Sequence, residues 1–265
     1  MSPGAQDKDF PWWLVALALI GLWTGVQIAT SDLYAQIFDA VVRGVRITIL
    51  VTVTAFLCAS AIGLGLAVMS LSRSIVLRQI ARFYIEVVRG IPILVLLFYI
   101  AFAGTPLLIA AINAVVEPLG LEPWRTRDIP LIVRAGLALT IGYSAFIAEV
   151  FRAGIQSVDS GQIEAAKALG FSGWQRFRLI VLPQAIRTIL PPLGNDFIAL
   201  VKDSSLVSVL GVADVTQLGK IYASGSFRYM ETYNIVAVIY LVLTIGLSLM
   251  LRGLERRLRR RRRGG

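Results

Sequence analysis

The sequence predicts an all-α integral membrane protein with six transmembrane helices and a short cytoplasmic helix between the fourth and the fifth. Three observations support this fold class: an apolar composition, six apolar runs of spanning length, and basic residues gathered in alternate connections. The chain has 265 residues, of which 57% are hydrophobic and 16% charged, and its mean hydropathy is +0.75. A soluble domain carries about 25% charged residues, so this composition indicates a protein that resides in lipid.

The composition also argues against several functions. The chain has no His and one Cys, so we expect neither a metal site nor catalysis by a thiol or an imidazole. Its net charge of +10 would suggest nucleic acid as the partner of a soluble protein. Here the basic residues follow the sides of a membrane, so we expect lipid contact and no nucleic acid.

Six apolar runs predict the transmembrane helices, since a helix needs about 17–25 apolar residues to cross the hydrocarbon core. They cover about 12–29, 46–71, 86–112, 131–151, 179–219 and 233–251. The first run has an alternative interpretation as a signal peptide, because Lys8 precedes it. We interpret it as a transmembrane helix, because the start Asp7-Lys8-Asp9 is not basic and no clear small-x-small cleavage site follows.

The basic residues predict the topology, because cytoplasmic connections of membrane proteins are rich in Lys and Arg. Three connections carry them: Arg73, Arg78, Arg82 and Arg89; Arg152, Lys167, Arg176 and Arg178; and Arg252, Arg256, Arg257 and Arg259 through Arg263. These three segments must lie on one side, which predicts a multi-pass membrane protein with both termini in the cytoplasm. We interpret the Arg-rich tail, 252–265, as an anchor on anionic lipid headgroups, with a specific ligand site as the alternative.

The polar segment 159–183 separates the fourth and fifth runs and cannot itself span a bilayer. Asp159 or Ser160 can cap a helix over about 161–169, and Gln162 completes an arrangement close to a capping box. Gly170 can adopt the left-handed conformation that ends a helix, and Trp174 starts a second amphipathic piece. The segment therefore predicts two short helices with a sharp corner between them.

The first of these helices has a mixed surface. Ile163, Ala166 and Leu169 recur at helical spacing, and Glu164 and Lys167 flank them. A short, exposed, capped helix has nothing to pack against in its own chain, so we expect a soluble partner to dock on it. The alternative is a solvated linker in which Glu164 and Lys167 form a weak pair.

Several motifs carry a family resemblance. The string Glu164-Ala165-Ala166, followed by Gly170 and then by Ile180, Leu182 and Pro183, resembles the EAA signature of permease subunits of bacterial ABC importers. Four blocks resemble the polar amino acid uptake branch of that family, which includes histidine, glutamine and arginine permeases: 88–94 (VRGIPIL), 148–158 (AEVFRAGIQSV), 182–185 (LPQA) and 202–209 (KDSSLVSV). The match runs in order from about residue 43 to 251.

The resemblance implies an architecture. A permease transmembrane domain over 43–251 would have the five-helix core of type I ABC importers and a coupling helix at about 160–175. Segment 1–42 would add an extra N-terminal transmembrane helix, whose role stays open, and 252–265 would be a cytoplasmic tail. Arg89, Gly90, Pro92 and Pro183 would be structural residues of the family motifs.

The resemblance also implies partners. The coupling helix, through Glu164, Ala165, Ala166, Lys167, Leu169 and Gly170, would insert into a cleft of a separate ATPase subunit, present as a dimer. ATP and Mg²⁺ would bind there, since this chain holds no G-x-x-x-x-G-K-[ST] phosphate loop and would be a transport subunit without enzymatic activity. A second permease chain, identical or different, and a periplasmic or lipid-anchored solute-binding protein would complete the importer, which would carry a polar amino acid.

The fifth run contains the candidate substrate contacts. Pro191 and Pro192 predict a kink or a break in its helix, and broken spans tend to line cavities. Asp196 and Asp203 are seven residues apart and share one face, and intramembrane carboxylates face protein, water or ligand. Acidic residues at these positions look like substrate contacts in relatives that carry basic amino acids, so we assign Asn195, Asp196, Lys202 and Asp203 to the pathway. For Asp203 the alternative is structural: it would pair with Lys202 of the other permease chain or with a helix terminus.

Two other functions fit parts of the sequence. A secondary transporter of a small polar solute would share the hydropathy and the intramembrane carboxylates, but it needs no stiff cytoplasmic corner. An intramembrane protease would need Asp196 and Asp203 to meet, whereas two helical turns separate them by about 10 Å. The sequence therefore favours the permease of an ATP-driven importer of polar amino acids.

Overall fold

The computed structural model describes residue 10 and residues 12–263, with side chains as far as Gly253. All regular elements of this part of the chain are helical, and it contains no strand. Its α-helices are α1 (Trp12–Thr30), α2 (Asp32–Val42), α3 (Gly44–Ser70), α4 (Ile75–Gly90), α5 (Ile93–Tyr99), α6 (Thr105–Val116), α7 (Leu131–Gln156), α8 (Ser160–Ala168), α9 (Gly173–Arg176), α10 (Leu182–Asp203), α11 (Val215–Ser226) and α12 (Tyr229–Arg263). Two π-helical turns, η1 (Ile100–Gly104) and η4 (Phe177–Val181), and three 3₁₀ turns, η2 (Glu117–Leu119), η3 (Thr126–Asp128) and η5 (Ser204–Leu210), complete the described elements.

The all-helical membrane architecture is confirmed, but the count of six spans is not. Within residues 12–253, five segments are long and apolar enough to cross a bilayer: 12–30, 32–70, 93–119, 131–156 and 229–253. They correspond to the predicted runs at 12–29, 46–71, 86–112, 131–151 and 233–251. The remaining predicted run, 179–219, contains α10, which has 22 residues but is less apolar than these five.

Helix α7 is the centre of the bundle. It packs along α3 and also contacts α4, α5 and α10. In its most apolar stretch, 61% of the residues are buried. Gly63 of α3 lets the two backbones approach closely, since a Cβ there would lie 3.0 Å from the backbone nitrogen of Ala148. Val51, Leu139 and Ile147 belong to the core cluster that α3 and α7 bury between them. This rigid pair supports the elements that carry the candidate site.

Two expectations about helix continuity are corrected. The predicted run 86–112 is interrupted, because α4 ends at Gly90 and α5 begins at Ile93, with Ile91 extended ahead of Pro92 as pre-proline residues prefer. The predicted run 179–219 is also not one span, because α10 ends at Asp203 and a 3₁₀ turn leads to Gly211 at φ +80°.

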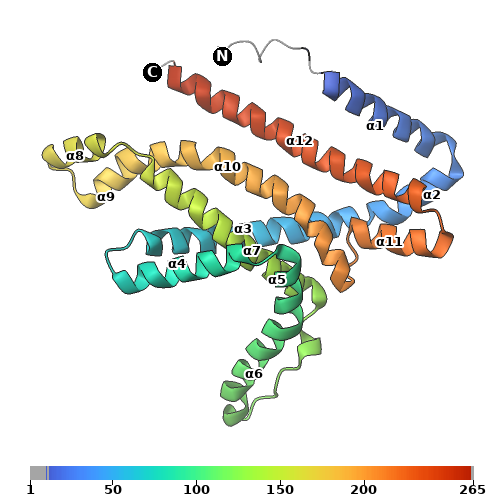
Figure 1. Ribbon diagram of the computed structural model, residues 1–265, viewed down its shortest axis with the longest axis horizontal. Helices are drawn as coiled ribbons and strands as arrows, with labels where there is room; N and C mark the ends of the chain where they lie inside the picture. Colours follow the sequence, from blue (N-terminus) through green and yellow to red (C-terminus); the bar gives the residue numbers. More distant parts are fainter. Residues whose placement is uncertain (1–9, 11, 264–265) are drawn as a thin grey trace.

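Pro191 and Pro192 do not break α10, which continues through both of them. The predicted break is therefore wrong. The alternative prediction, a kink, agrees with the change of direction of α10 in Figure 1. Neighbouring helices can compensate the backbone groups that proline leaves unpaired in a membrane helix.

The basic segments lie together, as their composition predicts. Figure 1 shows the α3–α4 turn, the α8–α9 corner and the C-terminal end of α12 at one end of the long axis. Helices α2 and α11 lie at the opposite end, and α5–α6 projects sideways from the bundle. Residues 1–9 and 264–265, at the ends of the predicted N-terminal segment and tail, lie outside the described residues.

Candidate functional site

Helix α8 forms because both of its ends are satisfied locally. Asp159 is the N-cap, and its carboxylate accepts a hydrogen bond of 3.2 Å from the backbone nitrogen of Gln162. At the other end Gly170 has φ +79°, and the Phe171 nitrogen donates to the Ala166 carbonyl at 3.0 Å. A left-handed glycine with such a bond is a frequent way to end a helix. The predicted boundary and the predicted cap are thus both observed.

The corner after α8 leads directly into a second capped helix. The Gln175 nitrogen donates to the Ser172 hydroxyl at 3.3 Å, and the Ser172 nitrogen donates to the Gln175 side chain at 2.8 Å. This reciprocal pair is a capping box, and α9 starts at Gly173, beside Trp174. The two helices with a sharp corner are present as the sequence predicts.

The surface of α8 is divided between the chain and the solvent. Ala166 is 3% exposed and faces the chain, whereas Leu169, which follows the last residue of α8, is 76% exposed, so the chain covers only part of the predicted apolar stripe. Glu164, Ala165 and Lys167 are exposed. The structure records no ion pair between Glu164 and Lys167, although it describes both side chains. The exposed residues of α8 are therefore available to another molecule.

Two side-chain bonds connect this corner to the fifth predicted run. The side-chain amide nitrogen Nε2 of Gln184, in α10, donates to the side-chain oxygen Oε1 of Gln162, in α8, at 2.6 Å. At the end of α7, the Ser157 hydroxyl donates to the Thr188 hydroxyl of α10 at 3.3 Å. The sequence analysis missed both contacts, because neither pair is recognisable without the packing of α10. They join α8 and the end of α7 to the same helix, α10.

The carboxylates of α10 have different environments. Asp203 accepts a hydrogen bond of 2.7 Å from the hydroxyl of Tyr143, a residue of α7 that is 4% exposed. Asp196 has a buried carboxylate oxygen, Oδ2, with no hydrogen-bond partner in the described chain. Asn195 and Lys202 are exposed. A buried polar atom without a partner is costly, so Asp196 is the member of this group whose hydrogen bonding is incomplete within the described chain.

Sequence reasoning missed Tyr143, and no local signal could have found it. The residue lies within the apolar run 131–151, where a tyrosine resembles any core aromatic. The sequence suggested two other partners for Asp203, a helix terminus and Lys202 of the other permease chain. The side chain of Asp203 does not cap the 3₁₀ turn that follows it. Within this chain the partner of Asp203 is therefore Tyr143.

The predicted motif residues occupy helix ends and turns. Arg89 lies 5.5 Å from the centre of the Phe146 ring, a cation–π contact between α4 and α7. Gly90 ends α4, and Pro92 precedes α5. Pro183 is the second residue of α10, which continues directly from the π-helical turn η4. The structural roles that the family resemblance implies for these residues stay predictions.

A polar cavity of about 220 Å³ opens beside this region. It is lined by Ser70, Arg78, Arg82, Ile85, Glu86, Glu149, Arg152 and Gln156, from α3, α4 and α7. Glu149 and Arg152 form an ion pair of 2.5 Å within it. The cavity lies at the basic end of the bundle and does not include the α10 carboxylates.

Comparison with known proteins agrees with this arrangement. Residues 59–263 match the family described as "Binding-protein-dependent transport system inner membrane component". The chain is 38% identical to the probable amino-acid permease protein YxeN of Bacillus subtilis over 80% of this chain and 88% of that protein. It is 36% identical to the glutamine transport system permease protein GlnP of Escherichia coli K12, over 82% and 92% respectively.

Solved structures give the same result. One chain of an amino acid ABC transporter crystallised with histidines is 38% identical, with a TM-score of 0.71, over 84% of this chain and 96% of that chain. A chain of the MetNI methionine ABC transporter in an inward-facing form shares the fold at 23% identity, with a TM-score of 0.65, over 83% and 97%. The protein therefore belongs to the family of binding-protein-dependent transport system inner membrane components.

Proposed function

We propose that this chain is the permease subunit of an ATP-driven importer of polar amino acids, located in the inner membrane. The observation that carries the proposal is the α8–α9 corner: a rigid, capped, exposed helix of nine residues that is tied to α10. The relatives support the same activity, since their names describe amino-acid permeases. A secondary transporter, the alternative from the sequence, has no use for such a corner, and no observation favours it.

In this proposal α8 docks on a separate ATPase subunit and carries its movement to the spans. Glu164, Ala165, Lys167 and Leu169 present the exposed surface, and Gly170 sets the angle of the corner. A movement of α8 reaches α10 through the Gln162–Gln184 bond. ATP and Mg²⁺ bind to the ATPase dimer, whose closure moves α8, and this chain contributes no catalytic residue.

The substrate pathway runs along α10. Asp196 would contact the substrate directly, because its buried oxygen lacks a partner within the described chain. Asp203 would be held in place by Tyr143, and Asn195 and Lys202 would complete the polar face. A carboxylate in this position favours a cationic amino acid, and the delivered substrate is selected first by a solute-binding protein, which is periplasmic or lipid-anchored.

A second permease chain, identical or different, would close the pathway. The α5–α6 arm projects from the bundle (Figure 1) and leaves large apolar side chains uncovered, among them Phe102, Leu107 and Val115 at 59%, 64% and 65% exposure. An arm of this kind is suited to packing on another chain. The basic segments at one end favour cytoplasmic termini, with 1–42 as the extra N-terminal segment, 43–251 as the permease domain and 252–265 as the tail.

The test is ATPase stimulation in proteoliposomes that hold this chain, its ATPase and its binding protein, with amino acids supplied one at a time. Glu164→Arg should abolish stimulation and release the ATPase, whereas Asp39→Arg, which changes an exposed acidic residue of α2 at the opposite end of the bundle, should leave the ATPase bound. Asp196→Asn should change which amino acid stimulates. A stable complex that no amino acid stimulates would contradict the substrate class, and a complex unaffected by Glu164→Arg would contradict the docking role of α8.

A further inference from the structure

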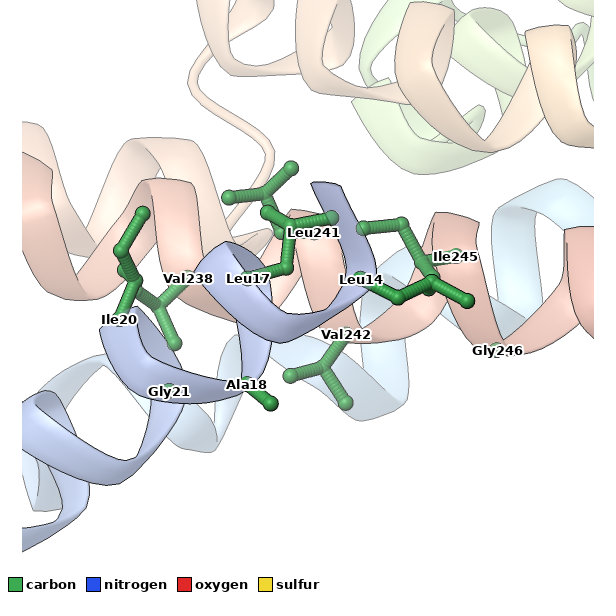
Figure 2. A pocket seen from close by; sticks show the side chains of 10 residues that line it. All are labelled: Leu14, Leu17, Ala18, Ile20, Gly21, Val238, Leu241, Val242, Ile245 and Gly246. Atoms are coloured by element: carbon green, nitrogen blue, oxygen red, sulfur yellow. The ribbon is translucent and has the colours of Figure 1, made fainter. Parts of the chain in front are cut away.

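The first helix contacts the rest of the chain only sparsely. Only 6% of the residues in the apolar stretch of α1 are buried, and among the described residues 12–30 the buried one is Thr24. Between α1 and α12 lies a groove of about 240 Å³ (Figure 2). The family motifs and the coupling helix lie elsewhere, so this groove has no part in the function proposed above.

The lining of the groove is apolar along its whole length. It consists of Leu14, Leu17, Ala18, Ile20 and Gly21 of α1 and Val238, Leu241, Val242, Ile245 and Gly246 of α12. Figure 2 shows Leu14 near Ile245 at one end and Ile20 near Val238 at the other, as expected for antiparallel helices. The residues from 14 to 21 cover about 10 Å of helix axis.

One end of the groove opens at the membrane–water boundary, because two residues there are typical of that depth. Trp13 immediately precedes the lining residue Leu14, and Arg252 comes near the end of the apolar segment 229–253. The Arg252 guanidinium lies 5.4 Å from the centre of the Trp13 ring. Tryptophan and arginine concentrate at bilayer interfaces. The exposed Arg252 thus places a cation at the mouth of an apolar groove.

The volume of the groove selects its occupant. A further transmembrane helix is about 10–12 Å wide with its side chains, which is too large for this space. A dry apolar cavity of about 150 Å³ already holds a benzene molecule, so about 240 Å³ accommodates a longer stretch of hydrocarbon. A lipid acyl chain fits both the size and the apolar lining.

We propose that the α1–α12 groove binds one acyl chain of an anionic phospholipid, whose phosphate headgroup pairs with Arg252. The sequence that follows, with Arg256, Arg257 and Arg259 through Arg263, adds positive charge on the same side of the groove. The bound lipid fills the space that side chains leave between α1 and α12. The extra N-terminal helix is thereby attached to the permease core partly through lipid.

Two glycines of the lining offer positions at which the groove can be filled. A Cβ on Gly21 or Gly246 would meet no atom within 4 Å, so Gly21→Leu with Gly246→Leu is the pair of changes that should occupy the groove. Gly25→Leu with Gly65→Leu is the matched control, since these glycines are equally unobstructed and do not line the groove. Arg252→Gln removes the cation and leaves the shape of the groove unchanged, since Arg252 is not one of its lining residues.

The full chain and each variant are reconstituted in vesicles of equal phosphatidylglycerol and phosphatidylcholine with the same acyl chains. After mild detergent extraction, the retained lipid is counted by native mass spectrometry. Wild type and the control pair should retain phosphatidylglycerol in preference to phosphatidylcholine, and the groove-filled pair should retain neither. Arg252→Gln should lower the preference about five-fold, the factor expected for one basic side chain at an anionic membrane surface.

Three outcomes would overturn the proposal. The groove-filled pair could retain as much lipid as wild type, or wild type could retain no lipid at all. Equal retention of both lipids by wild type would contradict the role of Arg252. Circular dichroism of the groove-filled pair and the control shows whether the helices remain intact, and no readout here depends on ATPase or substrate, so the result is separate from that of the proposed function.

Discussion

Any side chain at Gly154 of α7 should destabilise the fold, because Gly154 packs directly against Ile189 of α10. A Cβ at Gly154 would lie 2.2 Å from Cγ1 of Ile189 and 2.9 Å from its Cδ1. Carbon atoms pack best at about 3.5–4.0 Å, so Ile189 or the helix would have to move by more than about 1 Å. Overpacking of this kind costs about 1–3 kcal/mol.

The expected effect is measured against a control on the same helix. Ala is favoured over Gly inside a helix by about 0.5–1 kcal/mol, and this gain applies to both Gly154→Ala and Gly136→Ala. Nothing lies within 4 Å of a Cβ at Gly136. The difference in the free energy of unfolding between the two variants therefore isolates the clash, and Gly154→Ala should be less stable by about 1–3 kcal/mol.

The assay is reversible unfolding of the purified chain in mixed micelles with increasing SDS. Ile189→Ala removes both atoms that the new Cβ would meet, so the double variant Gly154→Ala with Ile189→Ala should be more stable than the sum of the two single changes predicts. Equal stability of Gly154→Ala and Gly136→Ala, or strictly additive effects in the double variant, would refute the packing argument.

Three further predictions use the same unfolding assay. Gly170→Ala should cost about 1–2 kcal/mol because Gly170 has φ +79°, and Gly173→Ala should not; equal effects would contradict the strain. Tyr143→Phe and Asp203→Ala should show a coupling energy of about 0.6–1.7 kcal/mol in a double-mutant cycle, since a 2.7 Å bond joins them in the membrane region; zero coupling would count against that bond. Asp214, which is fully buried, caps α11 at 2.8 Å from the Gln217 nitrogen and accepts from the Tyr240 hydroxyl at 3.0 Å, so Asp214→Ala should cost about 1–3 kcal/mol. Asp214→Asn keeps the cap and should cost less, and an equal loss would show that the cap contributes nothing.

The sequence was most informative where the structure depends on residues that are close together in the sequence. Asp159, Gln162 and Gly170 predicted the ends of α8 correctly, because a cap and a left-handed glycine act within a few residues. Five of the six predicted apolar runs likewise correspond to spanning segments, since the length of a run sets whether it can cross a bilayer. The coupling and substrate roles of the named residues stay predictions.

The sequence was less informative about helix continuity. Pro92 coincides with a break between helices, whereas Pro191 and Pro192 lie inside a continuous one. Proline removes a backbone donor in each case, and the outcome depends on whether packed neighbours compensate it. That information is not local, which is why the run 86–112 was predicted as one helix and why we offered a break in α10.

By itself, the sequence determined that this protein is helical, that it belongs in a membrane, and that it carries a capped corner in its most polar connection. These properties follow from composition, from the length of apolar runs and from interactions within about four residues. Only the tertiary structure decided that Tyr143 meets Asp203, 60 residues away, and that Gln184 meets Gln162. An apolar helix can pack in many rotations about its axis, and the rotation that brings these side chains together depends on packing across helices, such as the close approach of Gly63 and Gly154 to their neighbours.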